Sequence, residues 1–182
     1  MRVVGIDQSY TGFGYSTGGE AIKKGFPASK YPNPYDRLWS IEKWLGNCLD
    51  EVIDQDSRNL DLIVMEGYAN AAKFGREAAG ELGWAVKRTC YARNFEPLVV
   101  PPTSLKKFVT GKGNAAKNEM LLGVYKQWGV SFADDNQADA YSLEQFGRAY
   151  LQETGARVSS IEEPIRLHKY QIEAIQKVKA GK

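Results

Sequence analysis

The segment NLDLIVMEGY, residues 59–68, constrains the fold more than any other part of the sequence. Its apolar run is too short for a buried helix and is rich in Ile and Val, which is typical of a parallel strand covered on both faces. Helical patterns flank it, from Leu38 to Ile53 before it and from Lys73 to Ala92 after it. The sequence therefore predicts an α/β fold with helices on both sides of a sheet.

Further strands and helices complete this pattern. Val3–Ile6, Gly12–Ser16 and Ala21–Phe26 are predicted to form an antiparallel meander, and EPLVVPP contains a short strand. Helices are expected after that strand, before Trp128, and from FADDNQADAY onward. We expect a five-stranded mixed sheet flanked by helices in a domain of residues 1–153. Residues 154–182 are predicted to be a linker and a basic helix, which could pack on a dimer, touch DNA or form a mobile arm.

Composition excludes several classes of protein. Hydrophobic residues make up 43% and charged residues 25% of the 182 residues, as in an ordinary folded domain. Two Cys and one His without metal-ligand spacing cannot form a structural zinc site. Because no run of 18 apolar residues occurs and the chain begins with a strand, we expect no membrane span and a cytoplasmic location, in a bacterial cell or a phage-infected host.

Three carboxylates lie beside residues that should be buried. Asp7 follows VVGI, Glu66 follows LIVM, and Asp139 shares a helix face with apolar residues. Singly, they could be a turn former, a surface group at a strand end and a charge in the first turn of a helix. Together they predict a site for hard divalent cations, because buried acids are costly unless they are paired. Such a site suits phosphodiester hydrolysis without a side-chain nucleophile.

Four motifs carry a resemblance to a known family: GIDQSYTGFGY, LIVMEGY, TGKGNAAKNEM and DDNQADAYSL. Their order and spacing resemble the RuvC family of Holliday-junction resolvases, over about residues 3–150. The resemblance implies a ribonuclease-H-like fold with an extra C-terminal helical segment. It also implies that Asp7, Glu66 and Asp139 bind catalytic Mg²⁺, with Mn²⁺ able to substitute, and that Lys117 faces the scissile phosphate.

The same resemblance implies residues that contact DNA. Lys112 is a loop neighbour of Lys117, and Lys106 falls near another basic position of the family. Tyr68 lies close to where the family has an aromatic residue that stacks at the centre of the junction, although it could equally be a core or rim residue.

The fourth metal ligand departs from the family pattern. The family usually has it three residues before the last aspartate, where this chain has Asn136. The nearby acids are Asp134 and Asp135. Asp135 is favoured because its spacing of four residues from Asp139 can place both on one helix face, but it could merely cap the helix.

The sequence thus predicts a metal-dependent crossover junction endodeoxyribonuclease that acts as a homodimer on four-way junctions and other branched DNA. The dimer is expected from the small residues of the helix in Lys73–Ala92 and from the need for two symmetric nicks. Two alternatives are a broader nuclease for flaps and forks and a catalytically silent junction-binding module. The opening also resembles the phosphate-binding hairpin of sugar kinases, but in those proteins the nucleotide lies between two related domains, and 182 residues cannot supply both. The preferred cleavage sequence and any need for a helicase stay open.

Overall fold

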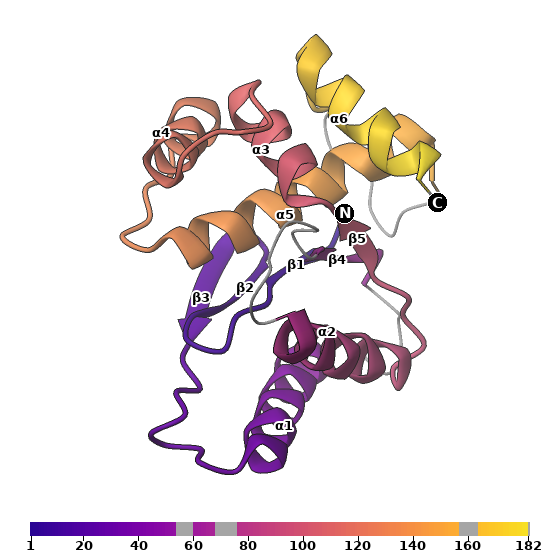
Figure 1. The fold of residues 1–182 in the computed structure, drawn as a ribbon. Helices are drawn as coiled ribbons and strands as arrows, with labels where there is room; N and C mark the ends of the chain where they lie inside the picture. Colours follow the sequence, from indigo (N-terminus) through magenta and orange to yellow (C-terminus); the bar gives the residue numbers. More distant parts are fainter. Residues whose placement is uncertain (54–59, 68–75, 157–163, 182) are drawn as a thin grey trace.

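The computed structural model describes residues 1–53, 60–67, 76–156 and 164–181. A single sheet lies between two layers of helices (Figure 1). Its strands are, in chain order, β1 Val3–Asp7, β2 Phe13–Thr17, β3 Glu20–Lys24, β4 Leu62–Glu66 and β5 Leu98–Val100. The helices are α1 Pro34–Val52, α2 Arg76–Tyr91, α3 Pro102–Thr110, α4 Lys117–Trp128, α5 Asp135–Thr154 and α6 Lys169–Ala180.

The sheet has the order β3-β2-β1-β4-β5. β1, β2 and β3 pair antiparallel, whereas β1 pairs parallel with β4 and β4 parallel with β5. The turn between β2 and β3 uses Gly18 and Gly19, both with positive φ, a conformation that residues with a Cβ rarely adopt. The predicted five-stranded mixed sheet is confirmed.

The two faces of the sheet have separate cores. α1 and α2 cover one face, where Ile41 and Val86 pack with Ile6 and Met65. α3 to α6 cover the other face, where Phe146 packs with Val64. This two-sided burial is why β1 and β4 are continuous apolar runs in the sequence.

α5 approaches the sheet at glycines. A Cβ at Gly5 would lie 2.1 Å from the main-chain oxygen of Ala140, and one at Gly14 would lie 2.3 Å from that of Asn136. Only glycine allows this distance between a helix backbone and a strand. The glycines of GIDQSYTGFGY therefore bring the first turns of α5 onto β1 and β2.

The C-terminal helix α6 packs on its own chain. Ala174 and Ile175 are buried in the core cluster on the α5 side of the sheet. Gln171 donates a hydrogen bond to Gln127 of α4 at 2.9 Å, and Lys107 of α3 pairs with Glu173 at 2.6 Å. The predicted C-terminal helix therefore packs on its own subunit, an arrangement that was not among the three roles considered from the sequence.

In the described ranges, no helix has the length and apolar character needed to cross a membrane.

Candidate active site

Two carboxylates lie at the same edge of the sheet because their strands are parallel. Asp7 is the last residue of β1 and Glu66 the last of β4. Side chains alternate between the faces of a strand, so Asp7 shares its face with Val3, and Glu66 shares its face with Val64. Both valines belong to the core on the α5 side. The two acids are therefore directed toward the helix that carries Asp139.

Asp139 joins them from the second turn of α5. Its negative charge acts on both Asp7 and Glu66, and one of its carboxylate oxygens, Oδ1, is buried without a hydrogen-bond partner among the described residues. Asp7 itself is only 6% exposed. The structure thus brings together the three acids that the sequence singled out.

Burial, together with neighbouring negative charges, raises the pKa values of all three acids. Burial, then the charges of Glu66 and Asp139, raise the pKa of Asp7 well above its ordinary value. Burial and the charge of Asp139 raise the pKa of Glu66 to about 7, against the opposing effects of a hydrogen bond with Asp7 and of Lys106. Burial and the charge of Asp135 raise the pKa of Asp139 to about 6. Three such acids at one edge are a mark of a functional site.

Two of the three predicted lysines reach this edge. The charges of Lys106 and Lys117 lower the pKa of Asp139, opposing its burial. Lys117 begins α4, where the main chain is fixed by a hydrogen bond from the amide of Ala116 to Glu119 at 2.7 Å. Both Lys117 and Lys112 are exposed, but Lys112 pairs with Glu119, at 3.5 Å, and not with an acid of the site. It lies beside the site in the chain without acting on the acids.

The three residues that could supply a fourth ligand have different partners. Asp134 caps α5 by accepting from the amide of Asn136 at 2.9 Å, and it also pairs with Lys23. The side chain of Asn136 donates to Asp134 at 2.8 Å. Asp135 pairs with Lys117, and its charge raises the pKa values of both Asp7 and Asp139. Asp135 is therefore the one directed toward the cluster, and the cap is Asp134.

The donor set fits a hard divalent cation by its chemistry. In the described part of the chain, no three His, Cys, Asp or Glu side chains already surround a point where an ion could bind. Asp7 and Glu66 instead share a hydrogen bond. Only oxygen ligands are present, one of them is unpartnered, and burial together with neighbouring negative charge raises the pKa values of all three acids. Asp7, Glu66 and Asp139 are the residues that would hold Mg²⁺.

Two residues complete the account of the predicted site. Tyr68 lies outside the described residues. Gln8 was not predicted, yet its side chain donates a hydrogen bond to the main-chain oxygen of Glu66 at 2.9 Å. The sequence could have indicated this role, because Gln8 directly follows Asp7 at the end of β1, and the neighbouring strand β4 also ends in an acid, Glu66.

Comparison with known proteins gives a likeness in structure but not in sequence. No family model matches the chain, and no curated protein matches it. Thermus thermophilus RuvC matches with a TM-score of 0.62 and 19% identity, over 86% of this chain and 98% of RuvC. The chain has a RuvC-like fold. T. thermophilus RuvC in complex with a Holliday junction substrate matches with a TM-score of 0.58 and 22% identity, over 79% and 90% of the two chains.

The RuvC-like fold confirms the predicted ribonuclease-H-like architecture. It shows how the sheet and helices are arranged. The chemistry of the site rests on the residues of this chain.

Proposed function

We propose that this chain is a Mg²⁺-dependent, structure-selective endodeoxyribonuclease that resolves four-way (Holliday) DNA junctions by paired symmetric nicks. Mn²⁺ is expected to substitute for Mg²⁺. The proposal depends above all on one observation: Asp7, Glu66 and Asp139 are gathered at one buried edge, where their pKa values stay raised despite two nearby lysines. The RuvC-like fold, shared with a protein solved on a Holliday junction, supports branched DNA as the substrate class.

In this proposal the acids and the lysines have separate roles. Asp7, Glu66 and Asp139 hold the cation, with Asp135 as the fourth ligand. When bound, Mg²⁺ would supply Lewis-acid activation of water and offset charge on the phosphate. Lys117 binds the scissile phosphate and stabilises negative charge in the transition state. Because Lys117 pairs with Asp135 here, binding the phosphate exchanges one anionic partner for another.

Binding of DNA depends on the lysines of α3, α4 and the loop between them. Lys106, Lys112 and Lys117 are proposed to contact phosphates, so affinity should fall steeply with salt. Replacing any one of them should reduce the salt dependence by about one ion. Tyr68 is proposed to stack at the centre of the junction.

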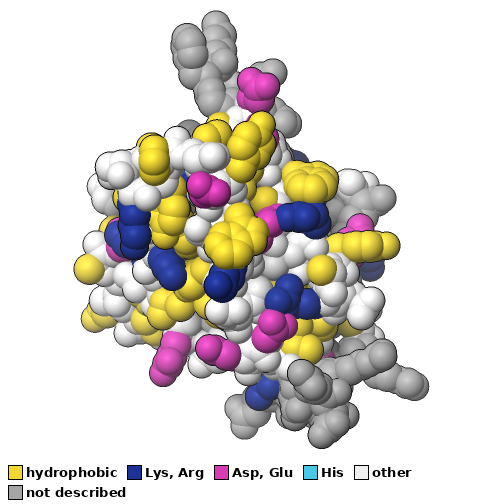
Figure 2. All heavy atoms as spheres, turned by 90° about the horizontal axis from the view of Figure 1, so that it is seen from below, with side chains coloured by type: hydrophobic (Ala, Val, Ile, Leu, Met, Phe, Trp, Pro, Cys, Tyr) yellow, Lys and Arg dark blue, Asp and Glu magenta, His cyan; other side chains and the backbone are white. Residues whose placement is uncertain are grey.

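The proposed homodimer has a suitable surface on α2. The dimer was predicted from the small residues of the helix in Lys73–Ala92. Of these, Gly83 and Ala85 are buried within the subunit, whereas Ala79 and Gly80 are half-buried and Ala78 is exposed. The outer face of α2 instead carries Trp84 and Tyr91, which are 63% and 78% exposed. Figure 2 shows the face that α1 and α2 form, where hydrophobic side chains lie among Lys and Arg. Exposed aromatic side chains of this size mark an interaction surface.

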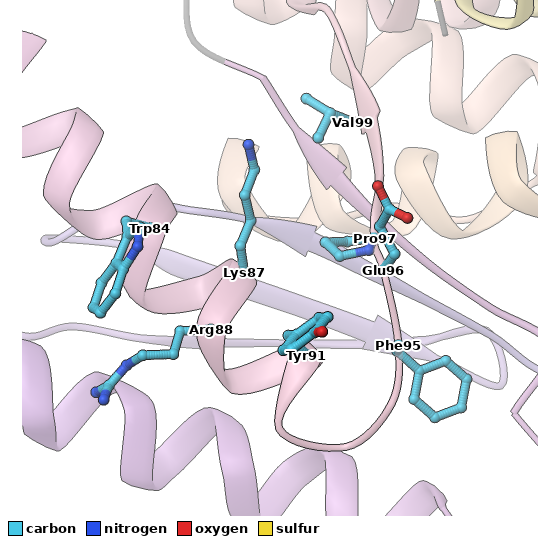
Figure 3. A pocket seen from close by; sticks show the side chains of 8 residues that line it. All are labelled: Trp84, Lys87, Arg88, Tyr91, Phe95, Glu96, Pro97 and Val99. Carbon is cyan, nitrogen blue, oxygen red and sulfur yellow. The ribbon is translucent and has the colours of Figure 1, made fainter.

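The residues around Trp84 form a groove (Figure 3). It is lined by Trp84, Lys87, Arg88, Tyr91, Phe95, Glu96, Pro97 and Val99. The guanidinium of Arg88 lies 4.9 Å from the ring of Trp84 and also pairs with Glu42, which holds both side chains in place.

The charges of α2 match those of a second, antiparallel copy. A two-fold axis at Trp84 would place Glu81 opposite Lys87 of the partner subunit, and would do so twice. We therefore propose α2 against α2 as the dimer interface. Glu81→Lys should shift the protein toward monomer in sedimentation velocity, and adding Lys87→Glu should restore the dimer. A dimer indifferent to both changes would contradict this register.

The function is tested by cleavage of labelled DNA. The protein, its Asp7→Asn variant and the remote surface variant Asp36→Asn are incubated with a four-way junction, a flap and a linear duplex, in Mg²⁺ or EDTA. We expect paired symmetric nicks on the junction from the protein and the Asp36→Asn control only, and only with Mg²⁺.

Two results would replace the proposal. Equal cutting of flap and junction would make the protein a general branched-DNA nuclease. Tight binding of the junction with no cutting in Mg²⁺ or Mn²⁺ would make it a binding module.

A further inference from the structure

Gln8 bridges the ends of the two strands that carry Asp7 and Glu66. The ladder between β1 and β4 ends with the pair Ile6 and Met65. Beyond it, Nε2 of Gln8 donates to the main-chain oxygen of Glu66 at 2.9 Å, so a side chain continues the pairing. On the other side of β4, the amide of Gly67 donates to the main-chain oxygen of Val100 at 2.8 Å. The main chain at Glu66 is therefore fixed from both neighbouring strands.

The other end of the same amide has no partner. Three buried side-chain atoms lack a hydrogen bond among the described residues: Oε1 of Gln8, Oδ1 of Asp139 and Oγ of Ser104. The first two belong to residues at the carboxylate edge. A buried acceptor without a donor costs about 1–3 kcal/mol, so a site that keeps two of them has a reason to do so.

The orientation of the Gln8 amide is determined by its neighbour. Turning it over would place Oε1 against the main-chain oxygen of Glu66, and two acceptors cannot bond to each other. Oε1 is therefore the atom left without a donor. Gln8 as a whole is half-buried, but this oxygen is buried.

We infer that Oε1 of Gln8 is a neutral oxygen ligand of the cation that Asp7, Glu66 and Asp139 hold. This inference rests on the proposed cation-dependent function. Amide oxygens of Gln are ordinary ligands of divalent cations. A neutral ligand also suits this place, because a further carboxylate would add to the repulsion among acids whose pKa values are already raised.

Two substitutions separate the two ends of the amide. Gln8→Met has a similar length and loses both donor and acceptor, whereas Gln8→Glu keeps an oxygen and, when ionised, loses the donor. Binding of Mn²⁺ is measured by isothermal titration calorimetry at about pH 8, without DNA. The exposed Gln176 of α6 provides the matched controls, Gln176→Met and Gln176→Glu. Thermal unfolding in EDTA checks that each variant is folded.

We expect Gln8→Met to weaken Mn²⁺ binding about tenfold, Gln8→Glu to bind at least as tightly as the unchanged protein, and the Gln176 variants to match it. Equal weakening in both Gln8 variants would overturn the inference and leave Gln8 as a positioning residue for Glu66. Unchanged binding in Gln8→Met would also overturn it. If the unchanged protein bound no Mn²⁺, the proposed function would fail with it, whereas the other two results leave that function intact.

Discussion

Glu144 and Asp139 are two acids on the same helix, α5, but they differ in their hydrogen-bond partners. Glu144 of α5 is fully buried, and the chain supplies its partners. It accepts hydrogen bonds from the hydroxyl of Ser16 at 2.6 Å, from the amide of Gly19 at 3.0 Å and from the guanidinium of Arg148 at 3.2 Å. This carboxylate joins α5 to the β2–β3 hairpin and needs nothing from outside the protein.

Asp139 lies five residues earlier and is treated differently. It is placed among other acids, its pKa is raised to about 6, and one of its oxygens has no partner among the described residues. The same helix therefore holds one acid whose partners are internal and one that keeps an unpartnered oxygen, for which we propose a cation as the partner. A buried acid with internal partners is typical of a structural role, whereas an acid with a raised pKa and a buried, unpartnered oxygen is a candidate for a functional site.

The largest expected effect is on cleavage. Asp139→Asn should reduce the rate of junction cleavage by on the order of 10⁴-fold, because the cation site loses a ligand. Glu144→Gln, which changes the other buried acid in the same way, should stay within about tenfold of the unchanged protein. Single-turnover cleavage at a temperature where both variants are folded measures this. Equal loss in both would erase the distinction.

The free energy of unfolding should fall when Glu144 is changed and not when an acid of the site is changed, which is the reverse of the effect on cleavage. Glu144→Gln removes a buried charge from Arg148 and should lower the free energy of unfolding by about 3 kcal/mol. Glu66→Gln removes a buried charge that is repelled by its neighbours, and should raise it by about 2 kcal/mol at about pH 8 without metal. Urea denaturation in EDTA, followed by circular dichroism, measures both. If Glu66→Gln were the less stable, the acids would be structural.

The raised pKa values of the acids at the site also predict how the stability of the protein depends on pH. Glu66 and Asp139 have pKa values of about 7 and about 6, above their ordinary values of 4.5 and 3.8. The folded chain therefore binds more protons than the unfolded chain between these limits, so the metal-free protein should lose stability as the pH rises from about 5 to about 8. Thermal unfolding in EDTA should show this fall, with a smaller fall in Asp139→Asn. A midpoint that rises with pH would contradict the raised pKa values.

The smallest expected effect concerns the fourth ligand. Asp135→Asn should weaken Mg²⁺ binding about tenfold, because Asp135 is directed toward the acids. Asn136→Ala should change it by less than about threefold, since Asn136 bonds to the cap residue Asp134. Calorimetric titration compares them directly. The opposite ranking would mean that Asn136, at the usual family position, is the fourth ligand.

Much of the site was predictable because strand ends and helical spacing are local properties. Asp7 and Glu66 each follow an apolar run, and parallel pairing brings such ends together. The inward direction of Asp139 was predicted because it shares a helix face with apolar residues. The partners of Lys112 and Lys117 were not predictable, because Lys112 lies in the loop before α4 and Lys117 at its first residue, and the sequence does not fix which acid each side chain meets.

Other features depend on contacts distant in the sequence. The bond between Gln8 and Glu66 spans 58 residues, and that between Ser16 and Glu144 spans 128. Glu144 gives no sign in the sequence that it is buried, because a charged residue in a helix is usually exposed. The packing of α6 on α3 likewise depends on tertiary contacts rather than on its basic composition.

The most direct test of the account is whether Mg²⁺ displaces protons from these acids. Calorimetric titration with Mg²⁺ at about pH 6.5, in two buffers of different ionisation enthalpy, measures binding and proton release together. The account predicts saturable binding with proton release that becomes smaller at about pH 8, that is lost in Asp139→Asn and that is kept in Glu144→Gln. Absence of Mg²⁺ binding, or binding that Asp139→Asn leaves unchanged, would contradict it.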